Sequence, residues 1–104
     1  MKQLLVVDDM DVMRSVVSSI ARDCDFDVTQ ASNGEQALQA LAMRRFDAIL
    51  SDWNMPNMNG EEFVRELRAR GATTPVIMVT AEADRAKIET LMAIGVQGYI
   101  LKPF

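Results

Sequence analysis

Histidine is absent from the 104-residue sequence, and cysteine occurs only once, at Cys24. Without histidine the chain lacks the commonest general base and the commonest transition-metal ligand, which excludes Ser-His-Asp triads, histidine-bound zinc and a phosphohistidine on this chain. A single cysteine cannot form an internal disulfide. Any chemistry must therefore depend on carboxylates, lysines and hydroxyl groups.

An excess of positive charge and a long apolar run are also missing. The chain has 15 acidic and 11 basic residues, a net charge of -4, so its overall field repels nucleic acid and direct DNA binding is not expected. No stretch approaches the roughly 18 apolar residues of a membrane span, and the first residues do not form a signal peptide. We expect one globular, cytoplasmic domain.

Short apolar runs alternate with helical periodicities along the whole chain. The runs predict strands at 4–7, 26–31, 47–52, 76–80 and 98–101, and helices are predicted at about 11–24, 35–43, 60–70 and 84–94. We expect Asp11 to be the N-cap of the first helix, Gly71 to be the C-cap of the third, and Cys24 and the methionines to fill the core. This alternation predicts an α/β fold with a doubly wound, five-stranded parallel sheet.

Polar residues stand where the predicted strands end. Asp8 and Asp9 follow the first strand, Asp52 ends the third, Thr80 ends the fourth and Lys102 follows the fifth. Ligands of such sheets bind outside the carboxyl ends of the strands. Two like charges about 4 Å apart cost about 4 kcal/mol at an effective dielectric constant near 20, so the carboxylates need a cation. Hard oxygen donors beside a lysine favour Mg²⁺, whereas zinc and copper are poorly matched.

A divalent ion beside a carboxylate, a lysine and a hydroxyl group suits phosphoryl transfer. A carboxylate nucleophile is already ionised and needs no general base, which fits the absence of histidine. We predict Asp52 to be the nucleophile, because it ends the third and central strand. Asp8 and Asp9 would hold the ion, and Lys102 and Thr80 would bind phosphoryl oxygens.

Four motifs occur together: VVDD at 6–9, SDWNMPNMNG at 51–60, VTAEA at 79–83 and GYILKPF at 98–104. In this order they resemble the receiver domains of bacterial two-component response regulators, and the resemblance covers nearly the whole chain. It implies a flavodoxin-like fold and phosphorylation of Asp52 by the phosphohistidine of a partner histidine kinase. It also implies that Asp9, Asp52 and the backbone carbonyl of Asn54 bind Mg²⁺, with Asp8 assisting through water.

The resemblance implies further roles around the phosphoryl group. Thr80 and Tyr99 would form a switch that changes the surface read by an output protein or effector domain. Asn54 and Glu82 would flank the phosphoryl group and tune its hydrolysis, and their identities are of the kind that accompanies a short-lived phosphoryl group. The protein would be a phosphoacceptor with weak self-phosphotransfer and autodephosphorylation activity rather than an enzyme. Trp53, next to Asp52, is expected to report Mg²⁺ binding by its fluorescence.

The sequence departs from the receiver pattern at its end, because receivers carry a final helix after the Lys-Pro turn and this chain stops at Phe104. Four buried side chains of such a helix are worth about 6–12 kcal/mol, which is comparable to the stability of a whole domain, about 5–15 kcal/mol. We therefore expect residues 1–104 to be a C-terminally incomplete receiver domain, or one that is completed by homodimer formation or exchange of elements.

Three other functions share parts of this pattern. A magnesium-dependent aspartyl phosphatase requires a second carboxylate two residues after the nucleophile, and Asn54 stands there. A flavin or nucleotide binder requires a phosphate-binding loop after the first strand, where Asp8 and Asp9 repel phosphate. A pseudo-receiver that acts without phosphorylation as a protein interaction module remains the alternative.

Overall fold

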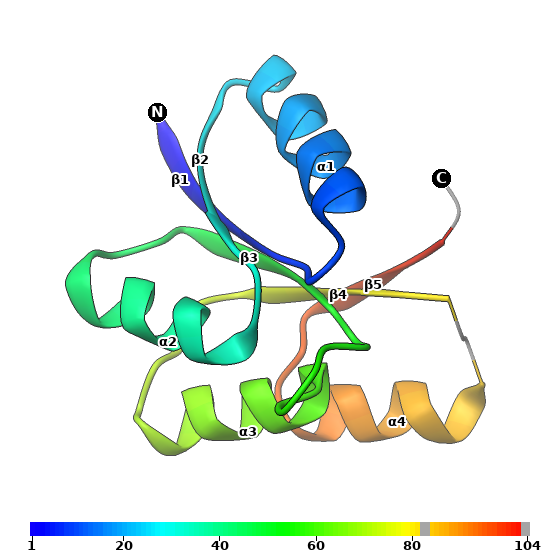
Figure 1. Cartoon of the computed structure of the whole chain (residues 1–104). Helices are drawn as coiled ribbons and strands as arrows, with labels where there is room; N and C mark the ends of the chain where they lie inside the picture. Colours follow the sequence, from blue (N-terminus) through cyan, green and yellow to red (C-terminus); the bar gives the residue numbers. More distant parts are fainter. Residues whose placement is uncertain (82–83, 103–104) are drawn as a thin grey trace.

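The computed structural model describes residues 1–81 and 84–102. Within this part, five strands form one parallel sheet in the order β2-β1-β3-β4-β5 (Figure 1). The strands are β1 (Lys2–Val7), β2 (Phe26–Ala31), β3 (Ala48–Asp52), β4 (Val76–Thr80) and β5 (Gly98–Leu101), and the helices are α1 (Asp11–Asp23), α2 (Gly34–Met43), α3 (Gly60–Ala69) and α4 (Arg85–Ala93). The predicted doubly wound fold is confirmed, and β3 is central as expected.

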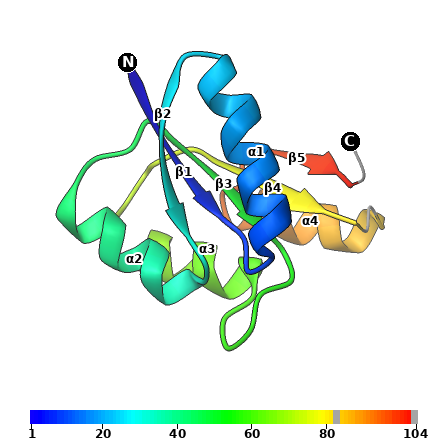
Figure 2. The same ribbon diagram turned by 45° about the horizontal axis from the view of Figure 1, so that its top comes forward.

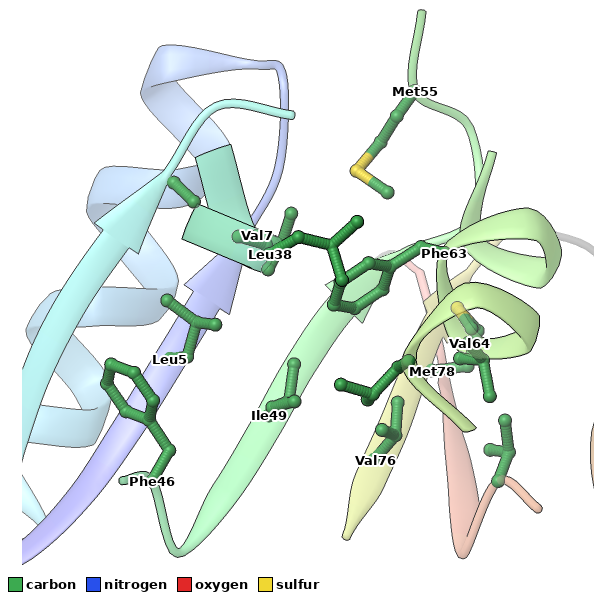
Figure 3. Packing of buried hydrophobic residues seen from close by; sticks show 14 of the residues in the cluster. Leu5, Val7, Leu38, Phe46, Ile49, Met55, Phe63, Val64, Val76 and Met78 are labelled. Atoms are coloured by element: carbon green, nitrogen blue, oxygen red, sulfur yellow. The ribbon is translucent and has the colours of Figure 1, made fainter. Parts of the chain in front are cut away.

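The helices lie on both faces of the sheet: α2, α3 and α4 cover one face and α1 covers the other (Figures 1 and 2). The larger core lies on the side of α2 to α4, where Leu5, Ile49 and Met78 of the sheet pack with Phe63 of α3 (Figure 3). A smaller cluster on the other face joins Leu4 and other strand residues to α1. Neighbouring strand residues thus point into two cores, which explains why β1 and β4 contain continuous apolar runs, whereas β2 at the sheet edge also carries polar residues.

The face that α1 covers is only partly closed. An apolar groove of about 480 Å³ opens there, lined by α1 and the sheet, with Val17, Ile20, Leu50, Val79 and Ile100 among its walls. No helix follows β5 in the part of the chain that the structure describes. Ile20 and Ile100 are consequently exposed.

Some apolar residues predicted to lie in the core are on the surface. Cys24, at the C-cap of α1, is exposed, so the prediction for it is wrong. It borders the apolar groove, where the sheet has no cover beyond α1. Met55 and Met78 are buried as expected, but several methionines at chain ends, in loops or at helix ends are exposed: Met1, Met10, Met43 and Met92.

Helix ends follow local hydrogen bonding. The N-cap of α1 is Met10 and not Asp11, because the Asp8 carboxylate accepts the Met10 backbone N–H at 2.9 Å and the helix begins directly after this turn. Asp11, as the first helical residue, pairs with Arg14 instead. The prediction that Gly71 is the C-cap of α3 is wrong by one position: Arg70 is the C-cap, and Gly71 follows it with a φ of 84°, the left-handed conformation in which glycine commonly ends a helix.

The helices are short, and none of those in the described residues is long and apolar enough to cross a membrane.

Candidate functional site

The carboxyl ends of neighbouring strands bring the predicted site residues to one edge of the sheet. The register pairs Val7 with Ser51, so Asp8 on the loop after β1 lies beside Asp52 at the end of β3. Asp52 pairs in turn with Val79, and Thr80 pairs with Leu101, the last residue of β5. The parallel register therefore explains why residues far apart in the sequence meet.

Three carboxylates form an acidic cluster, which we define as Asp8, Asp9 and Asp52. One oxygen of each lies within 4.8 Å of the others. Asp8 and Asp52 are buried, with 4% and 5% of their surface exposed, whereas Asp9 is exposed. The cluster thus combines two desolvated carboxylates with one that faces solvent, an arrangement that attracts a cation and leaves it accessible.

Lys102 brings a positive charge to this cluster. Its Nζ lies 3.1 Å from Asp52 Oδ1, within hydrogen-bonding distance, and 3.7 Å from Asp8 Oδ2. The Lys102 backbone N–H donates to the Thr80 carbonyl at 2.8 Å, which continues the pairing of β5 with β4 one residue past the strand. Backbone pairing therefore places Lys102 at the edge of the sheet that carries the acidic cluster, and its contacts with Asp52 and Asp8 hold the ammonium group there.

The pKa of Asp52 is raised above its ordinary value of 3.8. Burial is the largest cause, because it disfavours the charged form, and the negative charge of Asp8 acts in the same direction. The hydrogen bond from Lys102 opposes both effects. Lys102 therefore only partly compensates the ionised Asp52, and a further cation would stabilise the site.

The start of α3 packs directly against Asp52. Gly60 donates its backbone N–H to the Trp53 carbonyl at 2.7 Å. A Cβ atom at Gly60 would lie 2.9 Å from the Asp52 carbonyl oxygen and 2.7 Å from Met78 Sδ, closer than real Cβ atoms come. Gly60 is therefore required for this contact, whereas the sequence indicated it only as a helix start.

Trp53 joins the site to α4. Its backbone N–H donates to the Val79 carbonyl at 3.0 Å, and the Lys87 Nζ lies 4.3 Å from the centre of its ring, a cation–π contact. The sequence did not predict this contact of Lys87, because only the packing of α4 against the rest of the fold brings Lys87 next to Trp53.

The remaining predicted residues have different surroundings. Thr80 is buried at the end of β4, with 1% of its surface exposed. Asn54 is exposed on the loop after β3. Tyr99 pairs with Met78 in the sheet and is 39% exposed. Glu82 lies outside the described residues, and the structure brings together Asp8, Asp9, Asp52 and Lys102.

The donor set fits a hard divalent cation. Three carboxylates supply oxygen ligands within a span of 4.8 Å, and the exposed Asp9 leaves room for the water molecules that Mg²⁺ retains. Over residues 1–81 and 84–102 the soft ligands of zinc or copper are missing from the cluster. The acidic cluster is thus a candidate magnesium site.

The fold and the cluster define a class: a doubly wound α/β domain with an acidic, lysine-bearing site at the carboxyl ends of β1, β3 and β5. Residues 4–104 match the family model described as "Response regulator receiver domain". The chain therefore belongs to the receiver domains of response regulators. It is a CheY-like receiver, a phosphoacceptor domain rather than an enzyme in the usual sense.

Curated relatives include the chemotaxis protein CheY of Pseudomonas aeruginosa and CheY-3 of Vibrio cholerae. Each is 43% identical over 98% of this chain, and the matches span 85% and 81% of the relatives. The solved structure of Vibrio cholerae CheY4 is 39% identical, with a TM-score of 0.95 over all of this chain and 88% of that chain.

A magnesium-containing structure is also similar. The receiver domain of the sensor histidine kinase PA1611 of Pseudomonas aeruginosa, with magnesium coordinated in its active-site cleft, is 33% identical with a TM-score of 0.88. The match covers 99% of this chain and 86% of that domain.

Proposed function

We propose that this protein is a phosphorylation-activated signalling switch, in which Asp52 accepts a phosphoryl group from the phosphohistidine of a histidine kinase. The observation that carries the proposal is the Lys102 Nζ at 3.1 Å from Asp52 Oδ1, inside the acidic cluster. A nucleophilic carboxylate beside a fixed cation and a candidate metal site has the parts that phosphoryl transfer needs. We place the protein in the cytoplasm, where such kinases present their phosphohistidine.

Asp8, Asp9, Asp52 and the backbone carbonyl of Asn54 would hold Mg²⁺. When bound, the ion neutralises charge on the carboxylates and on the phosphoryl oxygens, so that the anions can approach. The magnesium-containing PA1611 receiver supports this assignment by similarity.

In the transfer step, an Asp52 carboxylate oxygen attacks phosphorus in line with the leaving imidazole. The O–P bond forms as the P–N bond breaks, and the imidazole takes up a proton from solvent. Asp52 acts as the nucleophile in its ionised form and needs no general base to remove a proton. Lys102, already in hydrogen-bonding distance of Asp52 Oδ1, would bind one phosphoryl oxygen, and the Thr80 hydroxyl would bind another.

The phosphoryl group would then change the output surface. We propose that Thr80 moves toward the phosphoryl oxygens and that Tyr99, 39% exposed on β5, changes its position in response. Asn54 and Glu82 would set the rate at which water removes the phosphoryl group. An output protein or effector domain would read the altered surface.

The apolar groove beside α1 is the second feature that needs a partner. We propose that it is covered in the working protein, either by chain that follows in a longer protein or by a second copy through dimerisation or exchange of elements. Sedimentation of these 104 residues tests this: self-association or incomplete folding is expected, and a stable, well-folded monomer would contradict it.

A phosphoryl analogue tests the switch itself. Mg²⁺ together with beryllofluoride, which mimics an aspartyl phosphate, is expected to change Trp53 fluorescence in the wild type. Asp52→Ala should show no response to beryllofluoride. If neither Mg²⁺ nor beryllofluoride changes the Trp53 fluorescence or the melting temperature of the wild type, the result would favour a pseudo-receiver that acts as an interaction module without phosphorylation.

A further inference from the structure

Arg14, on the first turns of α1, reaches back to the loop that carries the acidic cluster. Its Nη1 donates to the backbone carbonyl of Asp8 at 2.8 Å, and its Nε donates to Gln30 Oε1 on β2 at 3.1 Å. Its Nη2 pairs with Asp11 at 2.6 Å. The guanidinium group is largely covered, with 16% of the side chain exposed, whereas Asp11 is 87% exposed.

The ion pair with Asp11 is the least valuable of these contacts, because exposed ion pairs contribute little. The hydrogen bond from Arg14 Nη1 to the Asp8 carbonyl affects the position of Asp9. That carbonyl belongs to the peptide unit between Asp8 and Asp9, so its direction sets where the chain places Asp9. On the other side of Asp8, the backbone N–H donates to the Ala31 carbonyl at 3.1 Å.

Asp8 is therefore fixed from several directions, since its carboxylate also accepts the Met10 N–H at 2.9 Å. Asp9 has no such support of its own: in the described part of the chain no hydrogen bond to its exposed carboxylate is found. The Asp9 carboxylate nevertheless lies within 4.8 Å of the other two, and the orientation of the Asp8–Asp9 peptide determines from where its side chain starts. Arg14 holds that peptide against β2.

We infer that Arg14 is a positioning residue for the divalent-cation site: it orients the Asp8–Asp9 peptide, and thereby the two carboxylates of the β1–α1 loop, without touching the ion. The inference rests on the proposed magnesium site. Replacing a residue that hydrogen-bonds to a metal ligand, and so orients it, typically lowers metal affinity 10–100-fold. Arg is suited to this role because its planar fork donates in several fixed directions at once, which Lys cannot do.

A charge effect and a positioning effect have opposite signs here. Arg14 carries a positive charge near three carboxylates, so removing that charge alone would strengthen Mg²⁺ binding. Removing the bond that orients the Asp8–Asp9 peptide would weaken it. The sign of the change therefore separates the two roles.

The test compares Arg14→Met, Arg14→Lys and Arg22→Met with the wild type. Arg22, in the last turn of α1, is exposed and offers the same loss of charge away from the loop. Mg²⁺ is titrated alone, and affinity is read from Trp53 fluorescence and from the rise in melting temperature. We expect Mg²⁺ affinity to fall about tenfold in Arg14→Met and severalfold in Arg14→Lys, and to be unchanged or slightly higher in Arg22→Met.

The possible failures are distinct. Tighter or unchanged Mg²⁺ binding in Arg14→Met, with the wild type binding normally, would overturn the positioning role, even if the melting temperature without metal fell. An Arg14→Lys variant with full wild-type affinity would also overturn it, because charge would then suffice. A wild type that does not bind Mg²⁺ at all would contradict the proposed function itself.

Discussion

Replacing Lys102 by Met leaves two buried carboxylates without the cation that now stands between them. The Nζ atom is 3.1 Å from Asp52 and 3.7 Å from Asp8. At an effective dielectric constant near 20 these distances correspond to attractions of about 5 and about 4.5 kcal/mol. Desolvation offsets much of this, and loss of one partner from a buried pair typically costs about 3–5 kcal/mol. We expect Lys102→Met to lower the free energy of unfolding by that amount at neutral pH without metal.

Urea denaturation in the presence of a chelator measures this loss, and two further conditions identify its cause. With Mg²⁺ present, the variant should regain more stability than the wild type, because the ion replaces the missing charge; a ligand at 100 times its Kd contributes about 2.7 kcal/mol. At about pH 3, below the ordinary Asp pKa, Asp52 is protonated in the folded and unfolded states, so the loss should shrink.

Lys2→Met is the matched control, because Lys2 is exposed at the start of β1, and it should change stability little. The electrostatic reasoning would be refuted if Lys102→Met lost the same free energy of unfolding at acid and neutral pH and if Mg²⁺ did not change that loss. The effect would then come from packing of the Lys102 stem.

Other substitutions test separate parts of the account. Burial raises the pKa of Asp52, so its ionised form lowers the free energy of unfolding at pH values above that pKa. Asp52→Asn should therefore be more stable than the wild type at neutral pH without metal. Denaturation measured at several pH values should show this gain disappearing as the pH falls below 3.8. Gly60→Ala should cost about 1–3 kcal/mol by overpacking, and its thermal denaturation should show this, since its Cβ would meet the Asp52 carbonyl at 2.9 Å. Arg68→Met should cost about 2 kcal/mol in urea denaturation, because Arg68 donates to the Thr74 and Gly95 carbonyls. Arg65→Met should be nearly neutral, because Arg65 is exposed and its ion pair is with Glu61 on the same helix.

The sequence was sufficient to predict the sheet and most of the acidic site. Continuous apolar runs identified the buried strands, and the parallel topology required that Asp8 and Asp52 meet at one edge. This prediction needed only the order of the strands, because each carboxylate follows a strand end directly.

Contacts made by side chains from elsewhere in the fold were beyond sequence reasoning. The bond from Arg14 to the Asp8 carbonyl depends on the angle at which α1 leaves the loop, and the Lys87 contact with Trp53 depends on how α4 packs. The prediction of Asp11 as the N-cap was wrong because the Asp8 carboxylate accepts the Met10 N–H, so the helix begins one residue earlier, with Met10 as its N-cap. Cys24 followed the apolar spacing of α1, but the groove beside that helix leaves it exposed.

The central claim is tested most directly by mass spectrometry after incubation with Mg²⁺ and a small phosphodonor. We predict one added phosphoryl group, mapped to the peptide that contains Asp52, formed only with Mg²⁺ and absent from Asp52→Ala. No adduct on a folded wild type that binds Mg²⁺, or an adduct that persists in Asp52→Ala, would contradict the account.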